Sequence, residues 1–254
     1  SDLIVKGVAL LKEYLHSEEF ILGIENNKPD AIAEMRRVFA GDPSVVVKPL
    51  KSVYPQGAKQ GLLYNAAGLV VGEGQRLASL GYIIINVTSL AKMAEYFETG
   101  MPLVSRCLTV DGSAIKEPKN LEAPIGTRIS YLVEACGGLK EEAGKVIFGG
   151  PMMGGAAPSA DVPVLKQNNG LLLFSKKAAA LPEPSACIRC GRCMHACPVG
   201  LNPAGLDRAC HAEDREALKK LKVNICMECG CCAYVCPAKR HLVAYNQMGK
   251  QMIK

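Results

Sequence analysis

The chain has 254 residues, of which 49% are hydrophobic, 21% are charged and 5% are aromatic. This balance supplies enough apolar side chains for one to three folded domains and excludes global disorder. No apolar run approaches the roughly 18 to 20 residues that cross a bilayer, and the first residues lack the features of a signal peptide. We therefore expect a soluble, cytosolic chain with no membrane span of its own.

Residues 1–104 alternate between helical and strand patterns. Helices are predicted where apolar residues recur at helical spacing, with Pro29 in a first turn and Ser89 as a cap. These helices cover 3–15, 29–39, 57–68 and 89–98. The predicted strands are FILGIE (20–25), SVVVKPL (44–50) and YIIINV (82–87). Strands separated by helices favour an α/β domain with a mostly parallel sheet.

From 105 to 177 the pattern changes to a small α+β unit. RCLTVDGSAI (106–115) predicts a hairpin arm that turns at Asp111-Gly112. Thr127 is expected to cap a short helix that ends at Gly137-Gly138. Two further strands are predicted, KVIFG (145–149) and GLLLF (170–174).

The last segment, 178–254, opens on a proline- and alanine-rich linker (178–186) and then repeats itself. CIRCGRCMHACP (187–198) and CMECGCCAYVCP (226–237) share the skeleton CxxCxxCxxxCP with a period of 39. Between them, residues 203–221 have helical spacing and good helix formers. We therefore expect this domain to be helical.

Both the cysteines and the formal net charge of +6 are concentrated in this segment. Residues 187–254 hold ten of the twelve cysteines. They also contain 11 Lys and Arg residues against 5 Asp and Glu residues, whereas residues 1–186 contain 19 basic and 19 acidic residues. A basic tail is typical of proteins that bind nucleic acid or anionic membranes. A cysteine-rich tail is typical of disulfide, zinc or iron–sulfur proteins. The cysteine spacing has to distinguish these classes.

The spacing predicts two [4Fe-4S] clusters. Three cysteines at intervals of three place three thiolates around a tight loop, and in the bacterial two-cluster pattern the fourth cysteine, followed by proline, ligates the other cluster. Such cross-ligation packs the two halves together and keeps the clusters close. The predicted ligands are Cys187, Cys190, Cys193 and Cys236 for cluster 1, and Cys226, Cys229, Cys232 and Cys197 for cluster 2.

Other roles for these cysteines fit the spacing less well. Structural zinc does not need the third and fourth cysteines, and a disulfide framework conflicts with a cytosolic chain. Cys231 offers a competing register for the second loop, but only Cys232 preserves the skeleton. We expect the histidines near the clusters, His195 and His211, to be structural or surface residues. The remaining cysteines are expected to act as small buried hydrophobic residues, namely Cys107, Cys136 and Cys210.

Outside the cysteines, few motifs indicate chemistry. No GxxxxGK[ST] occurs, and GEGQRL (72–77) misses the last glycine of GxGxxG, so motifs do not predict a nucleotide site. GGPMMGG (149–155) is interpreted as a tight connection between domains, or as a loop that covers a cluster or contacts a ligand. The four histidines are too scattered to pair a nucleophile with a base. No catalytic residue is predicted.

Several segments together carry a family resemblance. They are GIENNKPDAI (23–32), YPQGAKQ (54–60), INVTS (85–89), GMPLVSRCLTVDG (100–112), GGPMMGG (149–155) and CPAKRHLV (236–243). With these segments, essentially the whole chain resembles the C subunit of the Rnf electron transport complex, a family similar to the flavin-bearing NADH dehydrogenase subunit of respiratory complex I. The resemblance implies a multidomain α/β and α+β protein. Its domains would be a partial FMN/NADH-type domain (1–104), an SLBB-like β-grasp domain (105–177) and a helical two-cluster ferredoxin domain (178–254).

The resemblance also implies a function. The protein would be the electron-transfer subunit of an ion-translocating ferredoxin:NAD oxidoreductase, using FMN, NAD(H) and two [4Fe-4S] clusters. Its partners would be the integral membrane subunits and a ferredoxin-like subunit, at the cytoplasmic face of the cell membrane. The family's Gly-rich loop for FMN and NADH would precede this chain, which looks N-terminally truncated. By matching position, Lys59 and Asn86 would face the flavin.

Two other functions remain open from the residues. The chain could be an electron-relay module without nucleotide chemistry of its own, or a subunit like the cobalamin reductase of propanediol-degrading compartments. Nucleic-acid binding is disfavoured, because each cluster with four thiolates carries about −2 when oxidised and about −3 when reduced. Basic residues beside the clusters are therefore expected to compensate this charge or to steer an acidic partner, among them Arg189, Arg192, Lys239 and Arg240.

Overall fold

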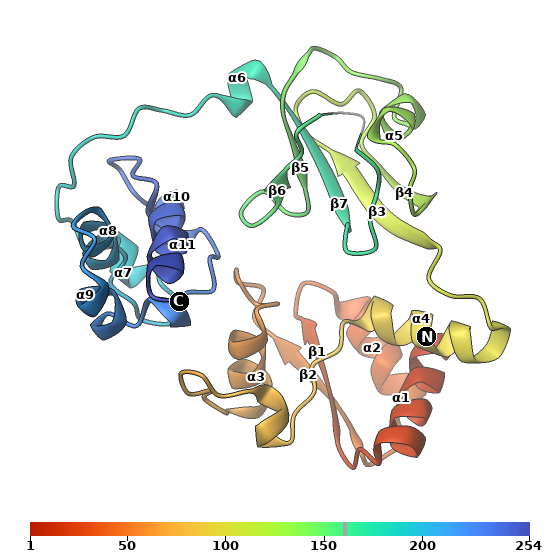
Figure 1. Cartoon of the computed structure of the whole chain (residues 1–254). Coiled ribbons are helices and arrows are strands. Elements are labelled where there is room, and N and C mark those ends of the chain that lie inside the picture. The colour runs from red at the N-terminus through yellow and green to blue at the C-terminus, as the bar shows by residue number, and fades with distance from the viewer. Residues whose placement is uncertain (160–161) are drawn as a thin grey trace. The chain divides into compact units, whose positions relative to one another are not determined.

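The computed structural model describes residues 1–159 and 162–254, which form two compact units, Ser1–Pro102 and Leu103–Lys254 (Figure 1). Each unit has its own buried core of apolar side chains. Among the described helices, none is long and apolar enough to cross a bilayer.

The first unit packs helices around a two-stranded parallel sheet. Strand β1 pairs with β2 along its full length, with Phe20 opposite Val45 and Glu25 opposite Leu50. Helices α1 and α4 lie side by side, and at their contact a side chain on Gly7 would overlap Leu90 (Figure 1). The elements are α1 (Asp2–Leu15), β1 (Phe20–Glu25), α2 (Pro29–Val38), β2 (Val45–Leu50), α3 (Lys59–Ala67), a 3₁₀ turn (Leu77–Leu80) and α4 (Val87–Thr99).

Two predictions for this unit are wrong. Residues 82–86 form no strand, and Ile83 and Ile85 are 63% and 38% exposed. An apolar run becomes a strand only where a partner strand takes up its backbone hydrogen bonds, and none of the described strands pairs with this segment. Helix α4 starts earlier than expected, because Asn86 rather than Ser89 is its cap, with the Asn86 side chain accepting a bond from Thr88 N at 2.9 Å.

Residues 105–175 form a β-grasp unit with a five-stranded sheet in the order β4-β3-β7-β5-β6. Strands β3 and β7 run parallel at its centre, and the other pairs are antiparallel. Helix α5 packs its Ile129 and Leu132 against sheet residues such as Leu108 and Leu171. The elements are β3 (Ser105–Asp111), β4 (Lys119–Pro124), α5 (Ile129–Ala135), β5 (Ala143–Phe148), β6 (Gly155–Ala156) and β7 (Gly170–Ser175).

The details of this unit correct three expectations. The β3–β4 connection spans 112–118 instead of a tight turn at Asp111-Gly112, since Val110 pairs with Lys119. Thr127 does not cap α5; the cap position is Arg128, and the Thr127 hydroxyl bonds to Pro124 O at 2.8 Å. GGPMMGG turns between β5 and β6 within this unit, so it does not connect domains.

The expectation that Cys107 is buried is also wrong, because the residue is exposed. It pairs with Glu122 across the β3–β4 ladder, while Leu108 and Val110 of the same strand are buried. Since side chains alternate along a strand, burying Leu108 places Cys107 on the opposite face. Cys136 and Cys210 are buried, as predicted.

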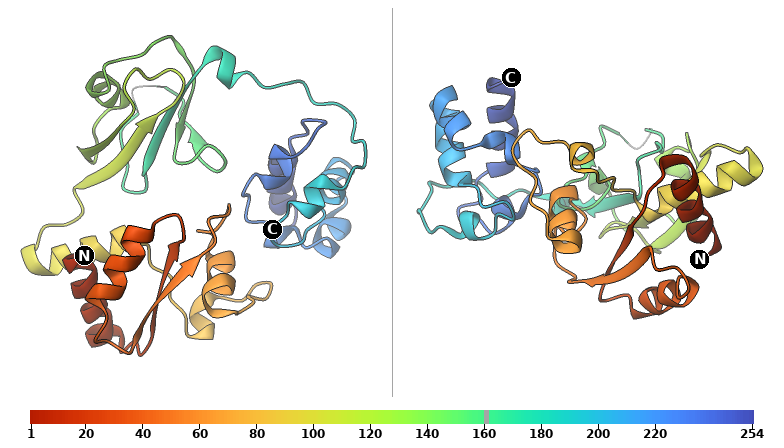
Figure 2. Two further views of the ribbon diagram at one scale, coloured as in Figure 1. Left: turned by 180° about the vertical axis from the view of Figure 1, so that it is seen from behind. Right: turned by 90° about the horizontal axis from the view of Figure 1, so that it is seen from below.

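The C-terminal part is helical. The expected helical segment 203–221 is divided into α8 and α9, because Glu213 has a positive φ of 51° and Asp214 caps α9 through a 2.9 Å bond from Ala217 N. Helices α8 and α11 pack side by side (Figures 1 and 2). This part begins with a short α6 (Lys176–Ala179) and an extended linker. The elements that follow are α7 (Arg192–His195), α8 (Pro203–His211), α9 (Arg215–Lys220), a 3₁₀ turn (Val223–Ile225), α10 (Cys231–Tyr234) and α11 (Leu242–Met252).

Gly112 provides a test of the β-grasp unit. Its φ is 123°, and a Cβ at this position would overlap the backbone carbonyl of Leu173 in β7. We predict that Gly112→Ala destabilises the protein by more than about 2 kcal/mol, because strain and overlap add. Gly126 is the matched control, because its φ is 96° but a Cβ at this position would have no atom within 4 Å. Gly126→Ala is expected to cost about 1 kcal/mol in denaturant unfolding; equal losses would contradict the role of the β7 contact.

Candidate metal centres

The two cysteine loops have the same backbone conformation. In each loop the residue before the second cysteine has a positive φ, 56° at Arg189 and 58° at Glu228. The residue after that cysteine is a glycine with positive φ, 75° at Gly191 and 83° at Gly230, which opens a one-turn helix. Two left-handed residues so close together fold the loop tightly enough to bring its cysteines to one side. The sequence period of 39 is therefore also a structural repeat.

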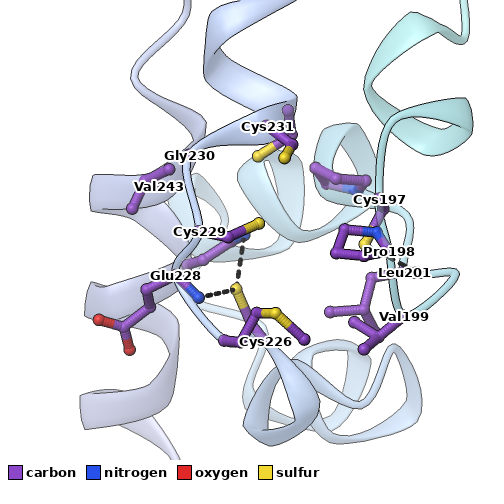
Figure 3. A pocket seen from close by; sticks show the side chains of 14 residues that line it. Cys197, Pro198, Val199, Leu201, Cys226, Glu228, Cys229, Gly230, Cys231 and Val243 are labelled. Atoms are coloured by element: carbon purple, nitrogen blue, oxygen red, sulfur yellow. Dashed lines mark hydrogen bonds between the residues drawn. The ribbon is translucent and has the colours of Figure 1, made fainter. Parts of the chain in front are cut away.

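The loops line two separate pockets, and each pocket receives cysteines from both halves of the repeat. We name them the Cys226 pocket and the Cys187 pocket, after the first cysteine of the loop that lines each. Figure 3 shows the Cys226 pocket, where Cys197 from the first half faces Cys226 and Cys229 of the second loop. The cysteines of the Cys226 pocket are Cys197, Cys226, Cys229, Cys231 and Cys232, and those of the Cys187 pocket are Cys187, Cys190, Cys193 and Cys236.

The remaining lining residues also correspond through the repeat. Ala204 of α8 lines the Cys187 pocket, and Val243, 39 residues later in α11, lines the Cys226 pocket. Leu201 and Arg240 are related by the same period, but each of them lines the pocket of the other half's loop. The two halves thus face each other around an approximate two-fold axis. The segment directly after each loop completes the pocket of the other loop.

The chemistry of the donor set fits a cluster. At least four cysteines surround each space, and four thiolates are the usual ligands of a [4Fe-4S] cluster. Backbone amides point at sulfur: Leu201 N lies 3.3 Å from Cys197 Sγ, and Glu228 N lies 3.4 Å from Cys226 Sγ. Such N–H donors stabilise negative charge on ligand sulfur. Among the described residues, no three His, Cys, Asp or Glu side chains converge on one point that could hold a single ion.

Burial governs the protonation of the inner cysteines. It raises the pKa of Cys232 to about 12, with the neighbouring Cys226 acting in the same direction. Burial also raises the pKa of Cys193, the equivalent residue of the first loop. A thiolate is the form that binds metal, so a cysteine with a raised pKa has to lose its proton before it can act as a ligand.

Cys231 also lines the Cys226 pocket, next to Cys232. It occupies the position that Arg192 has in the first loop, whereas Cys232 and Cys193 are equivalent and are 8% and 9% exposed. Burial raises the pKa of Cys231 to about 11, and a hydrogen bond with Cys229 is the second cause of this increase. Cys231 and Cys232 therefore both line the pocket, but only Cys232 has a cysteine at the equivalent position of the first loop.

The basic residues of this segment have different surroundings. Arg240 lines the Cys187 pocket, but the buried Asp207 of α8 accepts bonds from its Nε at 2.6 Å and its Nη2 at 3.0 Å. This pairing neutralises Arg240 locally, so it is not a free compensating charge. Arg189, Arg192 and Lys239 are exposed, as residues that steer a partner need to be.

The other candidate residues lie outside the pockets. Lys59 is the exposed first residue of α3, and Asn86 is the exposed cap of α4. His195 is exposed on α7, while His211 Nδ1 lies 2.8 Å from Asp207 O and its ring centroid lies 4.2 Å from that of Tyr245. Sequence reasoning missed Asp207 and Asn246, which line up when the period of 39 is continued beyond the cysteines.

Comparison with known protein families agrees with this arrangement. The family model described as the Nuo51 FMN-binding domain matches residues 1–95. The SLBB domain matches 108–156, and the 4Fe-4S dicluster domain matches 180–240, which contains both cysteine loops.

The chain is also similar to curated proteins over most of its length. It is 42% identical over 206 residues to the C subunit of the proton-translocating ferredoxin:NAD(+) oxidoreductase complex of Clostridium ljungdahlii, covering 81% of this chain and 45% of the relative. It is 38% identical to the Na(+)-translocating counterpart of Acetobacterium woodii, covering 81% of this chain and 46% of the relative. This chain belongs to the family of Rnf C subunits. It spans less than half the length of these relatives.

A solved structure supports the fold of this Rnf family member. The NAD+-reducing [NiFe]-hydrogenase in its H2-reduced state aligns with 99% of this chain and 52% of its own, with a TM-score of 0.61 at 14% identity. At this identity the likeness concerns the fold alone. It agrees with the mixed α/β and α+β architecture expected from the sequence.

Cross-ligation can be tested with pairs of cysteine substitutions. We predict that Cys236→Ala combined with Cys190→Ala loses no more iron than either substitution alone, because both remove ligands from the Cys187 pocket. Cys236→Ala combined with Cys229→Ala should remove both clusters, since it damages both pockets. Iron and acid-labile sulfide per chain are the readout, and Cys107→Ala, on the exposed face of β3, is the control. The reverse pattern would show that each loop binds its own fourth cysteine.

A second prediction separates the adjacent cysteines. Cys232→Ala should lower the iron content from about eight to about four per chain, while Cys231→Ala should leave it unchanged, because only Cys232 matches Cys193. The same iron assay decides, with EPR of the reduced protein to count the clusters. Loss of iron in Cys231→Ala with retention in Cys232→Ala would reverse the assignment.

Proposed function

We propose that this chain is the electron-relay part of a membrane-associated, ion-translocating ferredoxin:NAD oxidoreductase. One observation carries the proposal: two pockets, each framed by cysteines from one loop and completed by a cysteine from the other half of the repeat. Membership in the family of Rnf C subunits and the relatives' names supply the reaction class.

The protein's own residues hold and shield the two centres. We propose that the ligands are Cys187, Cys190, Cys193 and Cys236 in one pocket, and Cys226, Cys229, Cys232 and Cys197 in the other. When bound, the clusters would supply one-electron transfer. Helices α8 and α11 pack against each other and hold both pockets in one packed domain, so little reorganisation accompanies a change of charge. The buried Leu206, Leu218 and Val223 belong to one apolar core, against which Cys197 and Cys226 pack.

The flavin and nucleotide chemistry belongs to the full-length protein. We propose that residues 1–104 contribute part of the FMN- and NAD(H)-binding domain, followed by a β-grasp domain to 177 and the ferredoxin domain. The match of the Nuo51 FMN-binding family to residues 1–95 supports this division. Lys59 and Asn86 are proposed to face the flavin; the Asn86 oxygen already accepts a bond from Thr88, which leaves its amide N–H groups to donate.

Partners follow from the same family. The relatives are named as subunits of a complex, so other Rnf subunits are the partners of this chain. We propose that the integral membrane subunits attach it peripherally at the cytoplasmic face, and that an acidic ferredoxin-like subunit exchanges electrons with it. The exposed Arg189, Arg192 and Lys239 support an acidic partner, because opposite charge accelerates and orients such encounters.

The proposed function predicts a specific reduction. Full-length protein purified anaerobically should contain one FMN and about eight iron atoms per chain, and NADH should reduce both clusters, as followed by EPR. Substituting Cys229 by alanine should abolish the signal of one cluster and retain the flavin. Intact iron without flavin or NADH reduction would instead support a relay module that lacks nucleotide chemistry, and iron well below eight would refute the two-cluster proposal.

A further inference from the structure

Asn246 lies on the face of α11 that borders the Cys226 pocket. Its side chain is 1% exposed, and its Nδ2 lies 3.4 Å from Cys226 Sγ. Its Oδ1 is buried and has no hydrogen-bond partner among the described residues. Buried polar atoms are normally satisfied, and among the described residues the bond from Nδ2 to Cys226 Sγ is the one hydrogen bond that this side chain makes. A thiolate sulfur can only accept, which fixes the N–H end toward Cys226.

The neighbouring bonds hold this geometry in place. Lys250, one turn further along α11, donates to the backbone oxygen of Cys226 and to Glu228 Oε1, each at 2.6 Å. Gln247 donates to Glu228 Oε2 at 2.8 Å. The segment from Cys226 to Glu228 is therefore tied to the same helix that carries Asn246, which keeps the amide and the sulfur at a fixed separation.

The other pocket lacks this donor at the equivalent position. Asp207 precedes Asn246 by 39 residues, on α8, and is similarly buried at 2% exposure. Its carboxylate accepts two bonds from Arg240, the residue that lines the Cys187 pocket. An ionised carboxylate has no proton to donate to a sulfur. The repeat has thus diverged at one buried position, where one half presents an amide to a ligand sulfur and the other half holds a guanidinium.

We propose that Asn246 sets the reduction potential of the cluster in the Cys226 pocket by donating a hydrogen bond to the Cys226 thiolate. The inference rests on the proposed function, because it needs a cluster in that pocket. Reduction makes a cluster and its thiolates more negative, so an N–H donor stabilises the reduced form more than the oxidised form. The bond therefore raises the potential of this cluster and leaves the one in the Cys187 pocket unaffected. Asn246 is a positioning and tuning residue, and the iron is held by cysteines.

The test is an anaerobic redox titration of the whole chain, followed by EPR. Asn246→Leu keeps the branched shape and removes the donor, and Asn246→Asp keeps the size and replaces the donor with an acceptor. At a fixed potential near the midpoint, Asn246→Leu should lower the reduced-to-oxidised ratio of one cluster by roughly threefold to tenfold, or about 30 to 60 mV for a one-electron couple. Asn246→Asp should shift it further in the same direction. The same substitution at the exposed Asn224, Asn224→Leu, is the matched control and should shift neither cluster.

A second comparison identifies which cluster moves. The shift should persist in the Cys236→Ala background, which retains the Cys226 pocket, and be absent in Cys197→Ala, which disrupts it. Full iron content with unchanged potentials in both Asn246 variants would overturn this inference and leave the proposed function intact. Wild-type protein without a cluster in the Cys226 pocket would overturn both. Should Asn246→Leu fail to fold, Asn246→Asp and Asn246→Ser decide by the same titration.

Discussion

The C-terminal part of the protein depends on one constraint, which is the exchange of the fourth cysteine between the two halves of the repeat. Cys197 follows the first loop but lines the pocket of the second, and Cys236 does the reverse. Neither pocket can be complete unless both halves are folded against each other. The pairing of α8 with α11, and the core formed by residues such as Leu206 and Leu218, therefore serve both pockets at once.

The same symmetry makes the differences between the halves informative. At positions related by the repeat, a difference in side chain shows where the two halves have diverged. Leu201 and Arg240 differ in this way, as do Asp207 and Asn246. In the first half a buried carboxylate fixes a guanidinium, and in the second a neutral amide reaches sulfur. The two electron carriers of the proposed relay are thereby placed in unequal surroundings.

Local patterns predicted most elements of the structure. Helices α1, α2, α3 and α8, and strands β1, β2, β5 and β7, lie where spacing and turn residues placed them. The failures share a cause. Residues 82–87 have the apolar pattern of a strand, but a strand forms only where a partner strand pairs with it. The face of the sheet on which Cys107 lies is likewise decided by the pairing of β3 with its neighbours. The helix starts at Asn86 and Arg128 differ from the predicted caps because several neighbouring polar residues compete for each start.

The sequence by itself determined the helical last segment, a small α+β unit before it and the spacing of eight cysteines, because each of these depends on local chemistry or on a repeat that survives in one dimension. The family and the β-grasp domain came from the resemblance of several segments to a known family. Only the tertiary structure decided that Asp207 neutralises Arg240 and that Asn246 reaches Cys226. These two contacts join residues 33 and 20 positions apart in the chain. No local pattern encodes them, since the first joins α8 to the segment before α11 and the second joins α11 to the second cysteine loop.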